Sequence, residues 1–99
     1  MRTLLKVSLA VQPANRGIKD GSLPKTLQSV MAELKPEASY FYAENGKRTA
    51  LFVFDMKDSS QIPSVVETFF MGFDAEVALT PVMNADDLKT GLDKLIKKL

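Results

Sequence analysis

The commonest catalytic residue types are absent from this chain, and the residues left to carry chemistry are polar side chains on predicted strands. Of the 99 residues, none is histidine and none is cysteine. The lack of histidine removes the commonest general base and metal ligand, and the lack of cysteine excludes thiolate chemistry and disulfides. The acidic pair Asp86-Asp87 fits the first turn of a helix better than a metal site. We assign no catalytic residue and expect no cofactor and no metal.

A polar face of the predicted sheet is the first candidate site. Where apolar and polar residues alternate along a strand, the polar positions share one face. These positions are Lys6, Ser8, Glu76 and Thr80, joined by Tyr40, Tyr42 and Thr49 if the opposite face of their hairpin packs on helices. One hypothesis is a cavity that binds a small organic ligand, with Lys6 and the tyrosines as polar anchors. The alternative is a hydrated dimer interface in which Lys6 pairs with Glu76.

Two further groups of polar residues are candidates for the rim of such a site. The first group is Asn15, Arg16 and Lys19, together with Asp20 beside them. It stands at a broken helix start, which suits a lid or an anion-binding turn but also an ordinary solvated turn. The second candidate is Arg48, which either anchors a ligand carboxylate or pairs with Glu44 or Asp74.

A hairpin over residues 39–56 is the element that must position most of these side chains. Two β-rich stretches flank Asn45-Gly46, and this dipeptide suits a type I′ turn because both of its residues tolerate positive φ. A two-residue turn fixes the register. It sets Glu44 opposite Lys47, Tyr42 opposite Thr49 and Tyr40 opposite Leu51. We expect Glu44 and Lys47 to form a cross-strand charge pair.

The remaining periodicities predict an α+β chain. Their order is β-α-β-β-α-β followed by a C-terminal helix, which right-handed crossovers arrange as a ferredoxin-like sheet with the first and third strands central. Pro81 cannot donate a hydrogen bond to a neighbouring strand, which places the fourth strand at an edge or Pro81 near the end of that strand. The predicted elements are a strand at 4–11 ended by Pro13, a short helical turn at 15–20, a helix at 22–34, a helix capped near Asp58 and ended by Gly72, a strand at 75–82, and a helix capped by Asn84.

Two apolar surfaces of these elements need cover. The third strand is apolar on both sides, with Phe52 and Phe54 facing one way and Leu51 and Val53 the other. A strand of this kind is usually covered on both faces, and so small a chain cannot supply both layers, which implies a partner subunit. The C-terminal helix carries an apolar stripe that we expect to be buried. The stripe is Leu88, Leu92, Leu95, Ile96 and Leu99.

Composition favours a single water-soluble globular domain over residues 1–99. Hydrophobic residues make up 45% and charged residues 25% of the chain, and the formal net charge is +1. No clustered basic face indicates nucleic-acid binding, and no segment is long and apolar enough to span a membrane. The apolar N-terminal stretch carries Lys6 and Ser8 and is expected to be a strand, not a signal peptide. We therefore expect a cytoplasmic protein with neither nucleic-acid nor membrane partners.

Four stretches carry a resemblance to known proteins. They are Asn15 to Lys25, Lys35-Pro36-Glu37-Ala38, Gly46-Lys47-Arg48-Thr49 and Thr80-Pro81-Val82-Met83. The chain resembles the dimeric α/β-barrel superfamily, which includes muconolactone isomerases and cofactor-independent antibiotic-biosynthesis monooxygenases. Within it, the stretches are similar to a family of small bacterial proteins that have no assigned activity. The resemblance implies two sheets packed face to face, with ligands bound between them or between sheet and helices.

The function expected from the sequence is a homodimeric α/β-barrel module that binds a small molecule in a sheet cavity. Many enzymes of the superfamily rely on histidine or tryptophan, and this chain has neither. That departure favours a protein without catalysis. One alternative is a cofactor-independent isomerase or monooxygenase that acts on a small cyclic substrate through Tyr40, Tyr42 or Lys6. Another is a protein-interaction or assembly module without a ligand.

Overall fold

The hairpin of β2 (Ala38–Glu44) and β3 (Lys47–Asp55) forms as the sequence predicts in the computed structural model, which describes residues 1–99. Asn45 and Gly46 both have positive φ, at 53° and 75°, as a type I′ turn requires. The predicted register is confirmed. Tyr42 lies opposite Thr49, and Tyr40 lies opposite Leu51.

The chain contains four strands and four α-helices. The sheet order is β2-β3-β1-β4, with every neighbouring pair antiparallel, so β1 and β3 are central. This α+β arrangement is compatible with a ferredoxin-like fold. The other elements are β1 (Arg2–Ser8), α1 (Val11–Asp20), α2 (Ser22–Leu34), a 3₁₀ turn (Ser59–Gln61), α3 (Ile62–Phe73), β4 (Glu76–Pro81) and α4 (Ala85–Lys98).

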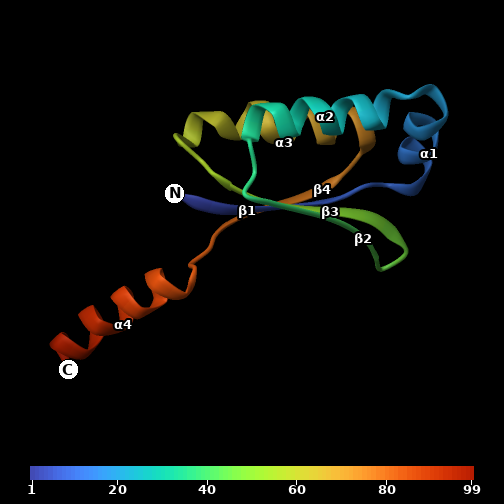
Figure 1. The fold of residues 1–99 in the computed structure, drawn as a ribbon. Helices are drawn as coiled ribbons and strands as arrows, with labels where there is room; N and C mark the ends of the chain where they lie inside the picture. The colour runs from blue at the N-terminus through green and yellow to red at the C-terminus, as the bar shows by residue number, and fades with distance from the viewer.

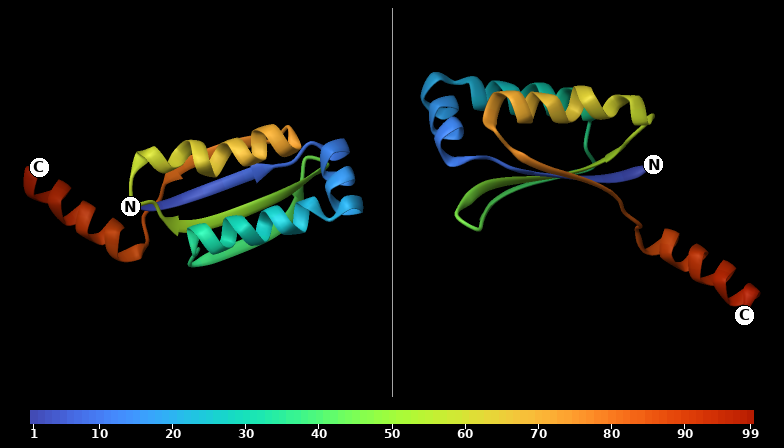
Figure 2. Two further views of the ribbon diagram at one scale, coloured as in Figure 1. Left: turned by 90° about the horizontal axis from the view of Figure 1, so that it is seen from above. Right: turned by 180° about the vertical axis from the view of Figure 1, so that it is seen from behind.

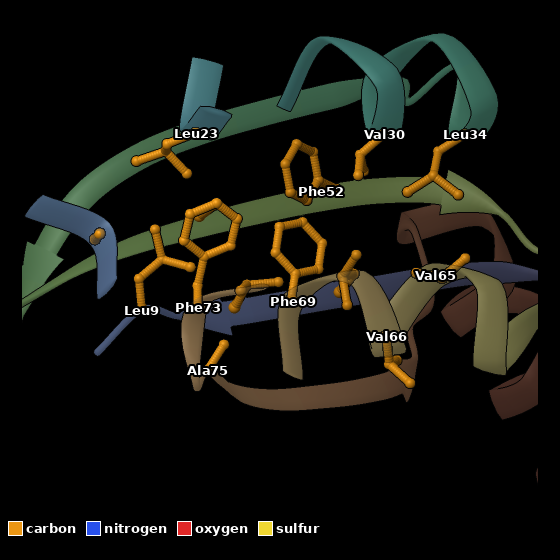
Figure 3. Packing of buried hydrophobic residues seen from close by; sticks show 14 of the residues in the cluster. Leu9, Leu23, Val30, Leu34, Phe52, Val65, Val66, Phe69, Phe73 and Ala75 are labelled. Carbon is orange, nitrogen blue, oxygen red and sulfur yellow. The ribbon is translucent and has the colours of Figure 1, made fainter. Parts of the chain in front are cut away.

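Helices α2 and α3 run along the same face of the sheet, and α1 stands at one end of it (Figures 1 and 2). The core fills the space between these helices and the sheet. Figure 3 shows Phe52 of β3 facing Phe69 and Phe73 of α3, with Leu23 and Val30 of α2 above them. The core cluster has 15 buried residues, and Phe52, Phe69, Leu5 and Val7 are completely buried within it. Phe54 is buried as well, so this face of the hairpin is the one that packs on the helices.

The start of α1 differs from the sequence prediction. The strand was expected to continue to Val11, but β1 ends at Ser8 and α1 begins at Val11, which is exposed. Pro13 does not end the strand. It lies in the first turn of α1, where a missing N–H breaks no helical hydrogen bond, and it is buried.

Helix termini are partly as predicted. Asp58 and Asn84 each form a capping box, with Gln61 and Asp87 respectively, so both caps are confirmed. Gly72 was expected to end the second long helix, but it lies inside α3. The left-handed residue that ends α3 is Asp74, with φ 47°, a residue type that tolerates this conformation better than most.

The second face of the sheet carries no helix, and α4 projects away from the body on that side (Figures 1 and 2). The predicted buried stripe of α4 is therefore wrong for the isolated chain. Leu88, Leu92, Leu95, Ile96 and Leu99 are 46–94% exposed. The projection also explains the radius of gyration, which is 16.0 Å, whereas a compact chain of this length has about 13 Å.

Candidate functional site

The helix-free face of the sheet, which we call the open face, gathers the polar residues predicted as a site. Strand alternation and register place them in rows across the four strands. One row runs Tyr42, Thr49, Ser8, Glu76; the next runs Tyr40, Leu51, Lys6, Ala78; and the third runs Ala38, Val53, Leu4, Thr80. All seven predicted positions thus belong to one face, with Tyr40 and Tyr42 exposed and Thr49 buried.

The charged side chains of the open face pair with one another, but not as expected. Lys6 pairs with Glu44, and Lys47 pairs with Glu76 at 3.5 Å. The predicted pairs Lys6–Glu76 and Glu44–Lys47 do not form. The hydrogen bond between Lys6 and Glu44 raises the pKa of the lysine and lowers the pKa of the glutamate. These pairs leave the face with balanced charge, because each ammonium is matched by a carboxylate.

A polar hollow of about 440 Å³ lies on this face. Its walls include Lys6, Ser8, Glu44, Lys47 and Glu76. Because its charges already satisfy one another, a ligand would have to compete with two existing ion pairs in order to bind there. The hollow is therefore a weaker candidate for a binding site than its residue types suggested.

The predicted rim residues do not come together. Asn15, Arg16 and Lys19 lie on α1, where Asn15 is half-buried and the two cations are exposed. None of them lines the polar hollow or the apolar cavity that is described next. Arg48 follows the turn on β3. It pairs with neither Glu44 nor Asp74, and it makes no ion pair.

An apolar cavity on the helix side of the sheet is the second candidate, and the sequence alone did not reveal it. Its volume is about 400 Å³. It is open to solvent on one side and is walled by the sheet, α2 and Phe69 of α3, with the exposed Arg48 as its one charged wall residue. The lining residues are Val7, Leu9, Leu23, Leu27, Phe41, Tyr42, Arg48, Thr49, Ala50 and Phe69.

The cavity exists because a small residue occupies the centre of an otherwise bulky row. Ala50 lies between Val7 of β1 and Phe41 of β2, so its methyl group leaves space that a larger side chain would fill. Phe41 stays partly exposed at the edge strand and packs edge to face on Phe52, with ring centroids 5.8 Å apart. The signal in the sequence was Arg48 itself, a cation in phase with the buried residues Ala50 and Phe52.

The arrangement can hold an organic molecule by its apolar body and offer one guanidinium to an anionic group. Ligand sites in proteins are commonly apolar cavities of 300–1,000 Å³ with a few placed polar groups. No group of acidic side chains lies close enough together to hold a metal ion, and no helix is both long and apolar enough to cross a membrane.

Sequence and structure together define a small α+β protein with a four-stranded antiparallel sheet. The chain matches no protein-family model, and no curated protein matches it significantly.

Proposed function

We propose that this protein is a homodimeric binding module for a small organic molecule that has an apolar body and a negatively charged group. The observation that supports the proposal is the cavity of about 400 Å³ with Arg48 as its single charged wall residue. Its apolar wall favours the body of the ligand, and burial of a modest aromatic ring there contributes about 1.5–3 kcal/mol.

Arg48 supplies the preference for an anion. A guanidinium presents a planar set of donors that suits a carboxylate or sulfonate, and hydrogen bonds to charged groups contribute about 1.5–3 kcal/mol each. Arg48 has no carboxylate partner in the chain, so an incoming anion displaces no existing ion pair.

The dimer is the second part of the proposal, and the open face supports it. Leu4, Leu51 and Val53 are only half-buried there, although they belong to the two central strands. A second copy would cover them, and the balanced charges of the face let two identical copies meet without like-charge repulsion. The resemblance to dimeric α/β barrels points the same way.

The binding part is tested with anilinonaphthalene sulfonate, a fluorescent probe with an apolar ring system and one anionic group. Wild-type protein is expected to bind it in a saturable manner with one site per chain. In Arg48→Met, the affinity falls about tenfold or more, since loss of one charge-assisted hydrogen bond costs about 1.5–3 kcal/mol. Fluorescence titration at fixed ionic strength measures the change.

A matched control and a neutral probe separate charge from shape. Arg16→Met removes an exposed cation that does not line the cavity and should leave the affinity unchanged. The uncharged parent compound, phenylnaphthylamine, should bind wild type and Arg48→Met alike. Equal binding of the sulfonate by wild type and Arg48→Met would show that the guanidinium does not recognise the anion, and Ala50→Leu, which fills the cavity, then shows whether the probe binds there at all.

A further inference from the structure

Helix α4 carries a well-formed apolar stripe that nothing in its own chain covers. Leu88, Leu92 and Leu95 lie on one side of the helix, at spacings of four and three residues, and each is about half exposed. The helix is nonetheless stabilised at both ends. It has a capping box at its start, two aspartates in its first turn and two lysines in its last turn. A helix of this design with a bare apolar stripe needs a surface to pack on.

Two contacts join the base of α4 to β1. The N–H of Val82 donates to the carbonyl of Arg2 at 3.1 Å, and the guanidinium of Arg2 pairs with Asp87 at 3.1 Å. Only Val82, Met83 and Asn84 separate β4 from α4. The result is the direction seen in Figures 1 and 2, away from the sheet and toward the side of the open face. In this arrangement no part of the same chain covers the apolar stripe of α4.

The matching surface is the apolar half of the open face, at the same end of the sheet from which α4 leaves. It consists of Leu4, Tyr40, Leu51 and Val53. Tyr40 is 64% exposed. α4 has 14 residues and is about 21 Å long, close to the roughly 24 Å length of a seven-residue strand.

The areas also favour use of both surfaces in one interface. At about 4.8 Å between strands, the open face covers roughly 450 Å² in projection, and the stripe of α4 adds about 200 Å². Together they present about 650 Å² in projection on each chain, which is of the same order as the roughly 800 Å² of accessible surface that each partner of a stable dimer buries, and the helix supplies about a third of it. The lysines of the last turn, Lys97 and Lys98, lie away from the stripe. Burial of the stripe therefore leaves no charged side chain buried without a partner.

We propose that α4 is an arm that binds a second copy of this chain, with its apolar stripe on the apolar half of that copy's open face. The inference rests on the dimer of the proposed function and adds the element that holds it together. Each chain gives one arm and receives one, which closes the pair with twofold symmetry.

The test uses the full chain with Leu92→Asp and Leu95→Asp combined, because neither residue contributes to the core and the body should still fold. Thr90→Asp, on the opposite side of α4, is the matched control. Native mass spectrometry and sedimentation should find wild type and Thr90→Asp as dimers. The dimer dissociation constant of the double variant should be at least about 100-fold higher than that of wild type, since each arm loses two apolar contacts. Binding of the sulfonate probe should be retained.

Cross-linking locates the arm, and the chain is suited to it because it has no cysteine. Chains with Leu92→Cys are mixed with chains with Leu51→Cys, and a short bis-maleimide should join them. Glu67→Cys, exposed on α3, should give no product with Leu92→Cys. A dimer that is insensitive to the double variant, or that cross-links only arm to arm, overturns this inference and leaves the binding proposal intact. A monomeric wild type overturns the arm and the proposed dimer together, including the case in which α4 binds anionic lipid vesicles instead.

Discussion

The two faces of the sheet differ in how far their side chains are buried within the single chain. On the helix side, Leu5, Val7 and Phe52 are completely buried by α2 and α3 of the same chain. On the open side, Leu4 and Leu51, one position along the same strands, are only half-buried, and ion pairs take much of the remaining surface. The helix side therefore stabilises the fold of the single chain, whereas the open face leaves apolar side chains partly exposed to solvent.

The largest expected effect comes from a substitution on the helix side of the sheet, and the neighbouring residue on the open face provides the comparison. Phe52→Ala removes a completely buried ring from the middle of the core and should cost about 3–5 kcal/mol of unfolding free energy. This is a large share of the roughly 5–15 kcal/mol that stabilises a domain. Urea denaturation monitored by circular dichroism measures it.

Leu51→Ala is the partner experiment on the open face. Its side chain is half-buried, so at concentrations where the protein is monomeric the loss should be only about 1 kcal/mol. At higher concentration the same substitution should weaken dimerisation. Similar losses for Leu51→Ala and Phe52→Ala in the monomer would mean that the two faces contribute alike, and the distinction drawn above would be wrong.

The hairpin was predictable because its signals are local. Asn45-Gly46 sets the turn, and the turn sets the register of Tyr40 and Tyr42 without help from the rest of the chain. The caps at Asp58 and Asn84 were predictable for the same reason. The position of Val11 was not, because a residue that continues the alternation of a strand can equally open a helix when Pro13 fits its first turn.

The site was less predictable because it depends on contacts between distant segments. The polar residues of the open face could be grouped by alternation, but their ion pairs could not, since Lys6 reaches Glu44 two strands away. The apolar cavity needs Ala50 opposite Phe41, which the predicted register gives, and it needs α2 above them, which only the packed structure shows. For α4, periodicity correctly indicated an apolar stripe but cannot say which molecule covers it.

A substitution of intermediate effect tests how tightly the helix side of the sheet is packed. Gly17 lies in α1, and a Cβ added there would come 2.6 Å from Cε1 of Phe73 and 3.0 Å from Cβ of Leu23. Gly17→Ala should therefore destabilise the chain by about 1–3 kcal/mol, in spite of alanine's better helix propensity. Gly72→Ala in α3, where a Cβ meets nothing within 4 Å, should instead stabilise by about 0.5–1 kcal/mol. Thermal unfolding compares the two, and a neutral Gly17→Ala would show that the contact of α1 with α3 is loose.

The smallest expected effect concerns charge at the end of β3, where packing contributes little. Hydrogen bonds from the Lys57 ammonium and from the N-terminal ammonium of Met1, both at 2.6 Å, lower the pKa of Asp55 to about 2. An aspartate in the unfolded chain titrates near 3.9. Because the folded pKa is the lower one, Asp55 stabilises the fold above about pH 4, and the contribution is lost as the pH falls from about 4 to 2.

In Asp55→Asn this acid-dependent part of the stability should be missing. Its melting temperature should lie slightly below that of wild type at pH 6, and the two should converge toward pH 2. Asp93→Asn on α4 removes a carboxylate from a helix that does not pack on the core, and it should keep the wild-type pH profile. Since all three partners are exposed, 1 M salt should shrink the difference at pH 6. A difference that persists in high salt, or that grows as the pH falls, would mean that Asp55 acts through packing and that charge is not what stabilises this end of the sheet.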